Sequence, residues 1–204
     1  MHQIQNHFET IANGVAEQGF AVVDDFLDEH QVNEILEPGL FTSGKLRQAG
    51  IGKETKQINE AIRGDNIQWI EKSSASPPLS LYFNYLDELR VFLNENLFLS
   101  LKDFEVHLAQ YPAGAFYKRH LDQFKSDDHR KLSVILYLNV GWTETEGGQL
   151  RMYPKKEIVD FLPKAGRLIC FRSDLIEHEV LPATRERLSI TGWMLDQYSD
   201  LKHL

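Results

Sequence analysis

Two histidines and one aspartate stand out in this sequence because together they suit a metal ion. His120 and Asp122 are separated by one residue, and His178 follows far downstream. Alternate residues of a β-strand point to the same face, so His120 and Asp122 can reach one ion together. Two imidazoles and one carboxylate occupy one face of a metal and leave the other face open. That arrangement is typical of non-haem Fe(II) oxygenases.

The same ligand set leaves a second interpretation open. Two histidines and one carboxylate also suit zinc, either in a hydrolase or as a structural ion. The strand context and Arg187, which follows shortly after His178, favour iron used with a keto-acid. The remaining histidines show no partner pattern and are expected to be surface or core residues: His2, His7, His30, His107, His129 and His203.

Arg187 opens an alternating apolar stretch that indicates a strand. The alternation places Arg187, Ser189, Thr191 and Trp193 on one side of this strand. A buried arginine needs an anion, and the distal carboxylate of 2-oxoglutarate would pair with its guanidinium bidentately. A protein carboxylate is the alternative partner and would make Arg187 purely structural. Tyr111 and Tyr137 lie on expected core strands and offer phenolic hydroxyls to the same ligand.

The secondary-structure elements that would position these residues follow two different patterns, one in each half of the chain. The first half predicts helices at 6–18, 29–37 (capped by Asp28) and 79–98, strands at 20–23 and 67–70, a polar loop or ragged hairpin at 42–61, and a linker at 73–78. From about residue 104, short strands alternate with turns. They are expected at 104–111, 116–120, 132–139, 149–153, 167–171, 177–181 and 188–195.

This pattern predicts an α+β fold, with N-terminal helices packed on a double-stranded β-helix, or jelly roll. We expect one catalytic domain over residues 1–204. Residues 1–103 would provide helical support and a substrate loop at 42–61, and residues 104–197 would form the dioxygenase core.

Composition limits which binding partners and which cellular compartment are expected for this protein. The net charge is −8 without a block of like charges, which argues against nucleic acid or an anionic membrane as the main partner. No signal peptide or membrane span is recognisable, so a cytoplasmic protein is expected. Cys170 is the only cysteine and lies in an apolar run, so we expect a buried, inert thiol. The sequence does not indicate an oligomeric state.

Several motifs together resemble one enzyme family over roughly residues 20–196. They are Tyr111-Pro112, Tyr117-x-Arg119-His120-x-Asp122, Tyr137-Leu138-Asn139, Gly147-Gly148-x-Leu150-Arg151, His178-Glu179-Val180-x-Pro182-Ala183, Arg187 with Thr191 and Trp193, and the segment 62–70. They resemble the 2-oxoglutarate- and Fe(II)-dependent prolyl hydroxylases, specifically the hypoxia-inducible-factor (egg-laying-nine type) enzymes and their bacterial relatives.

The resemblance implies roles for individual residues. His120, Asp122 and His178 would be the catalytic iron ligands. Arg187 and Tyr137 would bind the distal carboxylate of 2-oxoglutarate, Tyr111 would approach its chelating end, and Thr191 and Trp193 would line the pocket. Substrate contacts would come from the loop 42–61 and from four further residues: Arg63, Asp65, Trp69 and Arg130.

The implied reaction is hydroxylation of a prolyl residue, at C4, in a protein substrate. It consumes 2-oxoglutarate and O2, releases succinate and CO2, and uses L-ascorbate (vitamin C) as reductant. A translation elongation factor is a candidate substrate. Hydroxylation of a free amino acid and a non-catalytic jelly-roll binding or sensor module are the alternatives. The loop 42–61 would be a lid over the peptide or, alternatively, a plain surface loop.

Overall fold

The computed structural model describes residues 2–37, 39–41, 44–50, 62–123 and 128–198. Its helices are α1 (His2–Gln18), α2 (Glu29–Leu36) and α3 (Pro77–Leu97), with short 3-10 helices η1 (Lys72–Ser74) and η2 (Glu144–Glu146). Its strands are β1 (Phe20–Val23), β2 (Arg47–Gln48), β3 (Asn66–Ile70), β4 (Asp103–Tyr111), β5 (Tyr117–His120), β6 (Arg130–Tyr137), β7 (Leu150–Tyr153), β8 (Val159–Phe161), β9 (Leu168–Arg172), β10 (Glu177–Val180) and β11 (Arg187–Leu195). Within these ranges, no helix is long and apolar enough to cross a membrane.

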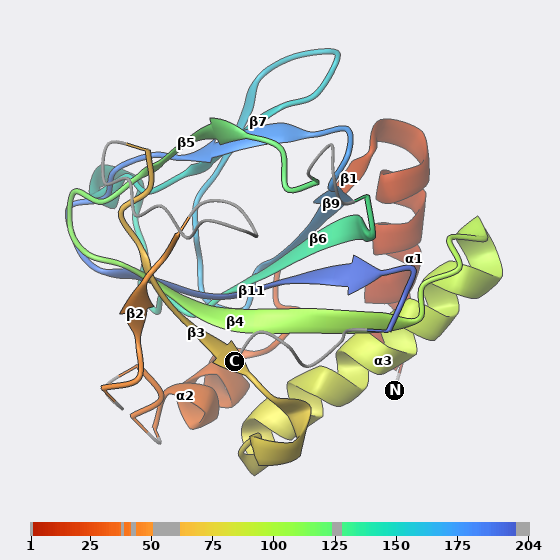
Figure 1. The fold of residues 1–204 in the computed structure, drawn as a ribbon, viewed down its shortest axis with the longest axis horizontal. Helices are drawn as coiled ribbons and strands as arrows, with labels where there is room; N and C mark the ends of the chain where they lie inside the picture. Colours follow the sequence, from red (N-terminus) through yellow and green to blue (C-terminus); the bar gives the residue numbers. More distant parts are fainter. Residues whose placement is uncertain (1, 38, 42–43, 51–61, 124–127, 199–204) are drawn as a thin grey trace.

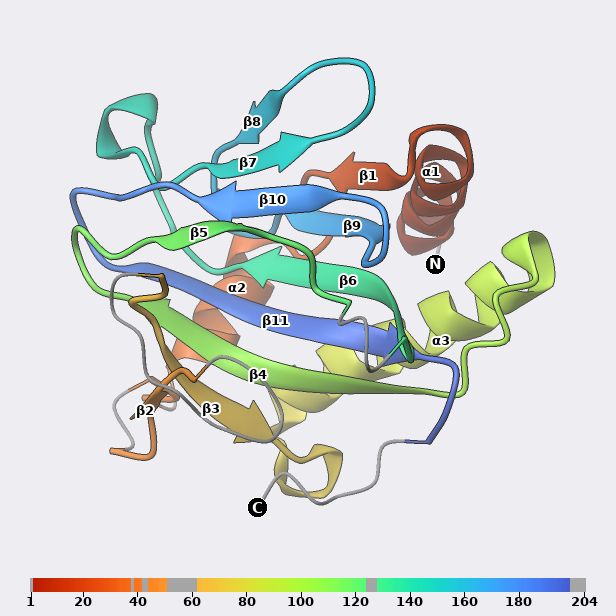
Figure 2. The ribbon, with the colours of Figure 1, turned by 45° about the horizontal axis from the view of Figure 1, so that its top comes forward.

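The strands form two antiparallel sheets that lie over one another. The major sheet runs β1-β9-β6-β11-β4-β3-β2, and the minor sheet runs β5-β10-β7-β8. Figures 1 and 2 show the minor sheet over one face of the major sheet, with α2 and α3 on the opposite side. Because β1, β2 and β3 precede residue 104, the N-terminal part supplies strands to the major sheet as well as helices.

Alternation along the central strands separates two apolar layers. On β6, Leu132, Val134 and Leu136 pack toward the helices, whereas Ile135 and Tyr137 pack between the two sheets. Successive side chains of a strand point to opposite faces, so a single strand serves both layers. The residues with candidate chemistry all belong to the layer between the sheets or to its open end.

Most predicted elements are present, with shifted ends. Asp28 caps α2 in a capping box: the Gln31 amide donates to Asp28 Oδ1 at 2.8 Å, and the Asp28 amide donates to the Gln31 side chain at 3.0 Å. Helix α1 begins at His2 rather than at residue 6. Of the predicted segment 42–61, positions 42–43 and 51–61 lie outside the described residues, and Arg47–Gln48 pair with β3 as a short strand.

One predicted element was wrong, and one strand was missed. Pro77 and Pro78 do not belong to a linker, because α3 begins at Pro77. Proline suits the first helical turn, where its fixed φ is already helical and its missing N–H has no helical acceptor. The strand β8 was not predicted at all, and it pairs with β7 at the edge of the minor sheet.

The thiol of Cys170 is expected to be unreactive in the folded protein. Cys170 lies on β9 with no exposed surface, and burial raises the pKa of its thiol to about 12. The thiolate is the reacting species, so both access and ionisation oppose modification. We expect no reaction with Ellman's reagent in native buffer and one thiol per chain after unfolding in guanidinium chloride. Rapid labelling of the native protein would contradict this burial.

Candidate metal centre and the pocket around it

The strands that carry the two histidines are direct neighbours. β5 and β10 pair antiparallel in the minor sheet, with His120 opposite His178. The strands predicted at 116–120 and 177–181 are therefore adjacent in one sheet. Asp122 follows just after β5 and is 8% exposed. His120 and His178, which are far apart in the sequence, therefore meet because of strand register. Asp122 lies close to them because it follows His120 by two residues.

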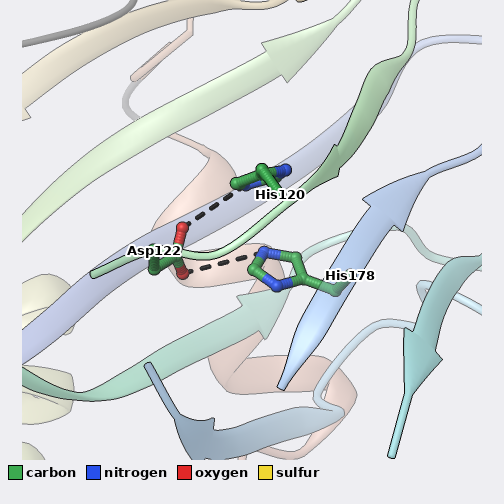
Figure 3. A group of neighbouring side chains, drawn as sticks. All are labelled: His120, Asp122 and His178. Atoms are coloured by element: carbon green, nitrogen blue, oxygen red, sulfur yellow. Dashed lines mark ion pairs between the residues drawn. The ribbon is translucent and has the colours of Figure 1, made fainter. Parts of the chain in front are cut away.

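The three side chains converge on one point. His120 Nε2 lies 3.4 Å from Asp122 Oδ1, and His178 Nε2 lies 3.7 Å from Asp122 Oδ2. One ligand atom from each residue lies within 4.8 Å of the others. Figure 3 shows both imidazoles directed toward the carboxylate. Among the described residues, this is the group of histidine, cysteine and carboxylate side chains that is arranged to hold an ion.

Backbone carbonyls orient both imidazoles. His120 Nδ1 lies 2.7 Å from the Lys118 carbonyl oxygen, and His178 Nδ1 lies 3.1 Å from that of Ile176. A carbonyl only accepts, so each Nδ1 carries the proton and each Nε2 presents a lone pair. Metal-bound histidines are held by their second nitrogen in this manner. The donor set therefore fits a divalent ion.

The protonation states at neutral pH also suit a metal. Burial alone would raise the pKa of the Asp122 carboxyl, but His178, His120 and Ser133 hold it well below its usual range. Burial lowers the pKa of His178 to about 4. The site therefore presents an ionised carboxylate and a neutral imidazole, the forms in which these groups bind metals.

The hydroxyl of Ser133 fixes the carboxylate, and removing it should weaken the metal site. Ser133 Oγ donates to Asp122 Oδ2 at 2.6 Å and lies 2.9 Å from Ser173 Oγ. Losing such a supporting contact costs about 10- to 100-fold in metal affinity. We expect this loss in Ser133→Ala, measured by calorimetric titration with Mn(II). Ser189→Ala, a buried serine on β11 that does not contact the triad, is the control. Equal affinities would refute the role of Ser133.

Arg187 lies buried at the inner end of the pocket. Its side chain is 2% exposed, its Nε donates to the Gly148 carbonyl at 3.0 Å, and one Nη donates to the Tyr137 hydroxyl at 3.2 Å. The guanidinium also lies 5.0 Å from the centre of the Tyr111 ring. No carboxylate forms an ion pair with it among the described residues. A buried cation without a counterion is costly, so this position favours binding of an anion.

Gly148 allows the backbone to approach Arg187 this closely. Its φ is +69°, a conformation that other residues adopt rarely. A Cβ at this position would lie 2.9 Å from Ala183 Cβ and 3.1 Å from a carbon of the Trp142 ring. The glycine is therefore required by both dihedral angle and space.

The outer residues of the pocket are held in ion pairs. Arg63 donates to Asp65 through two bonds of 2.6 and 2.8 Å, and Arg130 donates to Glu105 at 2.7 and 2.9 Å. Arg130 also stacks over the Trp193 ring at 3.5 Å. Because Asp65 is fully buried, it holds Arg63 and does not itself face the pocket.

Most sequence-predicted site residues line one pocket. Its wall contains the triad and six other predicted residues: Arg63, Tyr111, Arg130, Arg187, Thr191 and Trp193. Tyr137 stands behind Arg187, and Trp69 stands behind His107, with its ring 5.1 Å away. His107 and Ser133 were not predicted as parts of this site, and Gly148 was predicted only as a member of the Gly147-Gly148 motif. Strand alternation was the available signal for His107, which shares a face of β4 with Tyr111.

The fold and the site define a class of enzyme. Residues 106–195 match the 2OG-Fe(II) oxygenase superfamily. A crystal structure of a Pseudomonas putida prolyl-4-hydroxylase is 41% identical, covers 94% of this chain and 100% of its own, and has a TM-score of 0.85. The chain belongs to the 2OG-Fe(II) oxygenase superfamily and, within it, to the prolyl hydroxylases. This family uses Fe(II), 2-oxoglutarate and O2, and the predicted resemblance is confirmed.

More distant animal proteins are also similar. A prolyl hydroxylase of Trichoplax adhaerens, solved with a hypoxia-inducible-factor oxygen-degradation-domain peptide, is 28% identical with a TM-score of 0.87, covering 96% of this chain and 91% of its own. Caenorhabditis elegans hypoxia-inducible factor prolyl hydroxylase is 32% identical over 93% of this chain and 28% of its own. Human Egl nine homolog 1 is 33% identical over 92% and 46% respectively. The chain thus spans less than half the length of these two curated relatives.

Proposed function

We propose that this chain hydroxylates a prolyl residue, at C4, in a protein substrate. One C–H bond of the prolyl ring becomes C–OH, while 2-oxoglutarate and O2 become succinate and CO2. The observation that carries the proposal is that a histidine-aspartate-histidine triad and a buried arginine without a carboxylate partner in the described structure open onto one pocket. The two facing sheets form the double-stranded β-helix in this proposal.

The inner half of the pocket would hold the iron and the co-substrate. His120, Asp122 and His178 would bind Fe(II), which together with 2-oxoglutarate supplies the O2 activation that C–H hydroxylation requires. Arg187 and the Tyr137 hydroxyl would bind the distal carboxylate, because they already form one hydrogen-bonded unit. The Tyr111 ring lies against the same guanidinium, which supports a place for its hydroxyl toward the chelating end.

The outer half of the pocket would receive the peptide. Arg63 and Arg130 offer guanidinium N–H donors, and Trp193 offers an apolar ring on which a prolyl ring can pack. Thr191 and Trp193 would form the boundary between the two halves. Trp69 extends the aromatic surface, since its ring centre lies 6.1 Å from that of Trp193.

Further parts of the proposal rest on the sequence. The loop 42–61 would close over the peptide, and L-ascorbate would keep the iron reduced. A translation elongation factor is the first protein to examine as substrate. The lone, buried Cys170 favours the reducing environment of the cytoplasm.

The proposal is tested first by anaerobic titration of the Fe(II)-loaded protein with 2-oxoglutarate. A weak visible metal-to-ligand charge-transfer band is expected. Its absence, with iron shown to be bound, would refute the keto-acid site. The enzyme would then be incubated aerobically with a proteome digest, and mass spectrometry should find one added oxygen on proline. Protein with Asp122→Ala is the control. If free amino acids are oxidised and peptides are not, the protein would instead be a small-molecule hydroxylase.

A further inference from the structure

His107 is a buried histidine within the proposed active site to which no role has been given. It lies on β4 opposite Thr191 of β11 and Trp69 of β3, and it lines the same pocket as the triad and Arg187. It is 1% exposed. Alternation along β4 puts it on the same face as Ala109 and Tyr111, which line the same pocket.

Both ring nitrogens of His107 lack a hydrogen-bond partner among the described residues. The indole nitrogen of Trp193, whose ring centre lies 5.3 Å from that of His107, also lacks one within the described part. A buried polar group without a partner is destabilising, and such groups in a native structure call for an explanation. Two neighbouring rings with unused nitrogens in the wall of one pocket point to a bound group that satisfies them.

The imidazole is held in place and held neutral. The rings of Trp69 and Trp193 stand at 5.1 and 5.3 Å from it. Burial lowers the pKa of His107 well below its usual range, and the charges of Arg63 and Arg130 lower it further. A neutral imidazole has one N–H to donate. Its other nitrogen accepts, and the nearby arginine and tryptophan side chains only donate, so the N–H groups of His107 and Trp193 are the ones that need an acceptor from a bound group.

We propose that the imidazole N–H of His107 donates a hydrogen bond to the metal-chelating carboxylate of bound 2-oxoglutarate. This rests on the proposed function and adds to it a second anchor for the co-substrate: Arg187 holds one carboxylate and His107 helps to orient the other. A carboxylate is favoured over a peptide carbonyl because a hydrogen bond to an ionised acceptor is roughly twice as strong as one to a neutral acceptor. His107 is thus a positioning residue for the co-substrate.

The test compares His107→Leu, which removes the N–H, with His107→Gln, which keeps a donor. Anaerobic titration of each Fe(II)-loaded protein, read from the charge-transfer band, gives the Kd for 2-oxoglutarate. A hydrogen bond to a charged group is worth roughly 10- to 100-fold in Kd. We expect that loss in His107→Leu with a shifted band maximum, and substantial recovery in His107→Gln. Metal affinity, measured alone with Mn(II), should be unchanged in both variants.

A second probe locates the contact. 4-Oxopentanoate keeps the keto group and the distal carboxylate of 2-oxoglutarate but has a methyl group where the chelating carboxylate stands. Its affinity, measured by competition, should be the same in wild type and His107→Leu. His7→Leu, which removes a histidine that stacks on Phe26 away from the pocket, is the matched control and should bind both ligands as wild type does.

The outcomes separate this inference from the function on which it depends. A band in wild type with an equal Kd and maximum in His107→Leu would overturn the inference alone. Equal weakening of both ligands would also overturn it, since the effect would then be a general change in the pocket. No band in iron-loaded wild type would overturn the proposed function and the inference with it.

Discussion

Replacing Asp122 by alanine is expected to reduce succinate formation and substrate oxidation to the level seen without enzyme. The change removes the only charged ligand and leaves two neutral imidazoles, a set too weak to hold Fe(II) in an oriented, open site. It also removes the acceptor of the Ser133 hydroxyl. The measurements are succinate production under air and calorimetric titration with Mn(II).

Asp196→Ala is the matched control for this experiment. Asp196 is also an aspartate in ion pairs, with His129 at 2.8 Å and Lys131 at 3.0 Å, and it does not line the pocket. We expect wild-type turnover and metal binding in that variant. Near-normal succinate formation by Asp122→Ala would show that the triad does not hold the catalytic metal.

Replacing Arg187 by leucine is expected to raise the Kd for 2-oxoglutarate by roughly 30-fold or more. Removing one partner of a buried, hydrogen-bonded charge pair costs about 2 to 5 kcal/mol, and 1.4 kcal/mol corresponds to a factor of ten. Lysine should not restore binding, because its ammonium cannot reproduce the fork that serves Gly148, Tyr137 and a carboxylate together. The charge-transfer titration measures both variants.

Arg185→Leu separates the specific effect from a general loss of positive charge. Arg185 precedes Arg187 by two residues, but it stacks over Trp142 and pairs with Glu146 near the surface. Surface ion pairs contribute little, so its Kd for 2-oxoglutarate should stay within about twofold of wild type. Equal increases in both variants would contradict a dedicated carboxylate site at Arg187.

The geometry of the site could be predicted wherever it depends on local alternation. His120 and Asp122, and likewise Arg187, Thr191 and Trp193, fall on one side of their segments because strand side chains alternate. The register that places His120 opposite His178 could not be read from the sequence, because strand pairing depends on contacts between distant segments. Residue types and the family resemblance grouped the three ligands, but neither gave the register.

The failures have physical causes as well. The proline pair at 77–78 suits both a linker and a first helical turn, and packing of the following apolar residues selected the helix. Strand β8 has only three residues and pairs on one side, so its local signal is weak. His107 carries no motif. Its proposed role rests on two tryptophans and a pocket that only the folded sheet brings together.

The contact between Arg187 and the Gly148 carbonyl has a consequence for selectivity. Because a main-chain atom and the Tyr137 hydroxyl fix the guanidinium, its place does not vary with a surface rotamer. The histidines of the triad are fixed by the pairing of β5 with β10. Because the guanidinium and the triad are both fixed, the distance between them selects co-substrates by carbon-chain length. With 2-oxoglutarate as the proposed ligand, its six-carbon homologue would have to buckle or lose one of its two contacts.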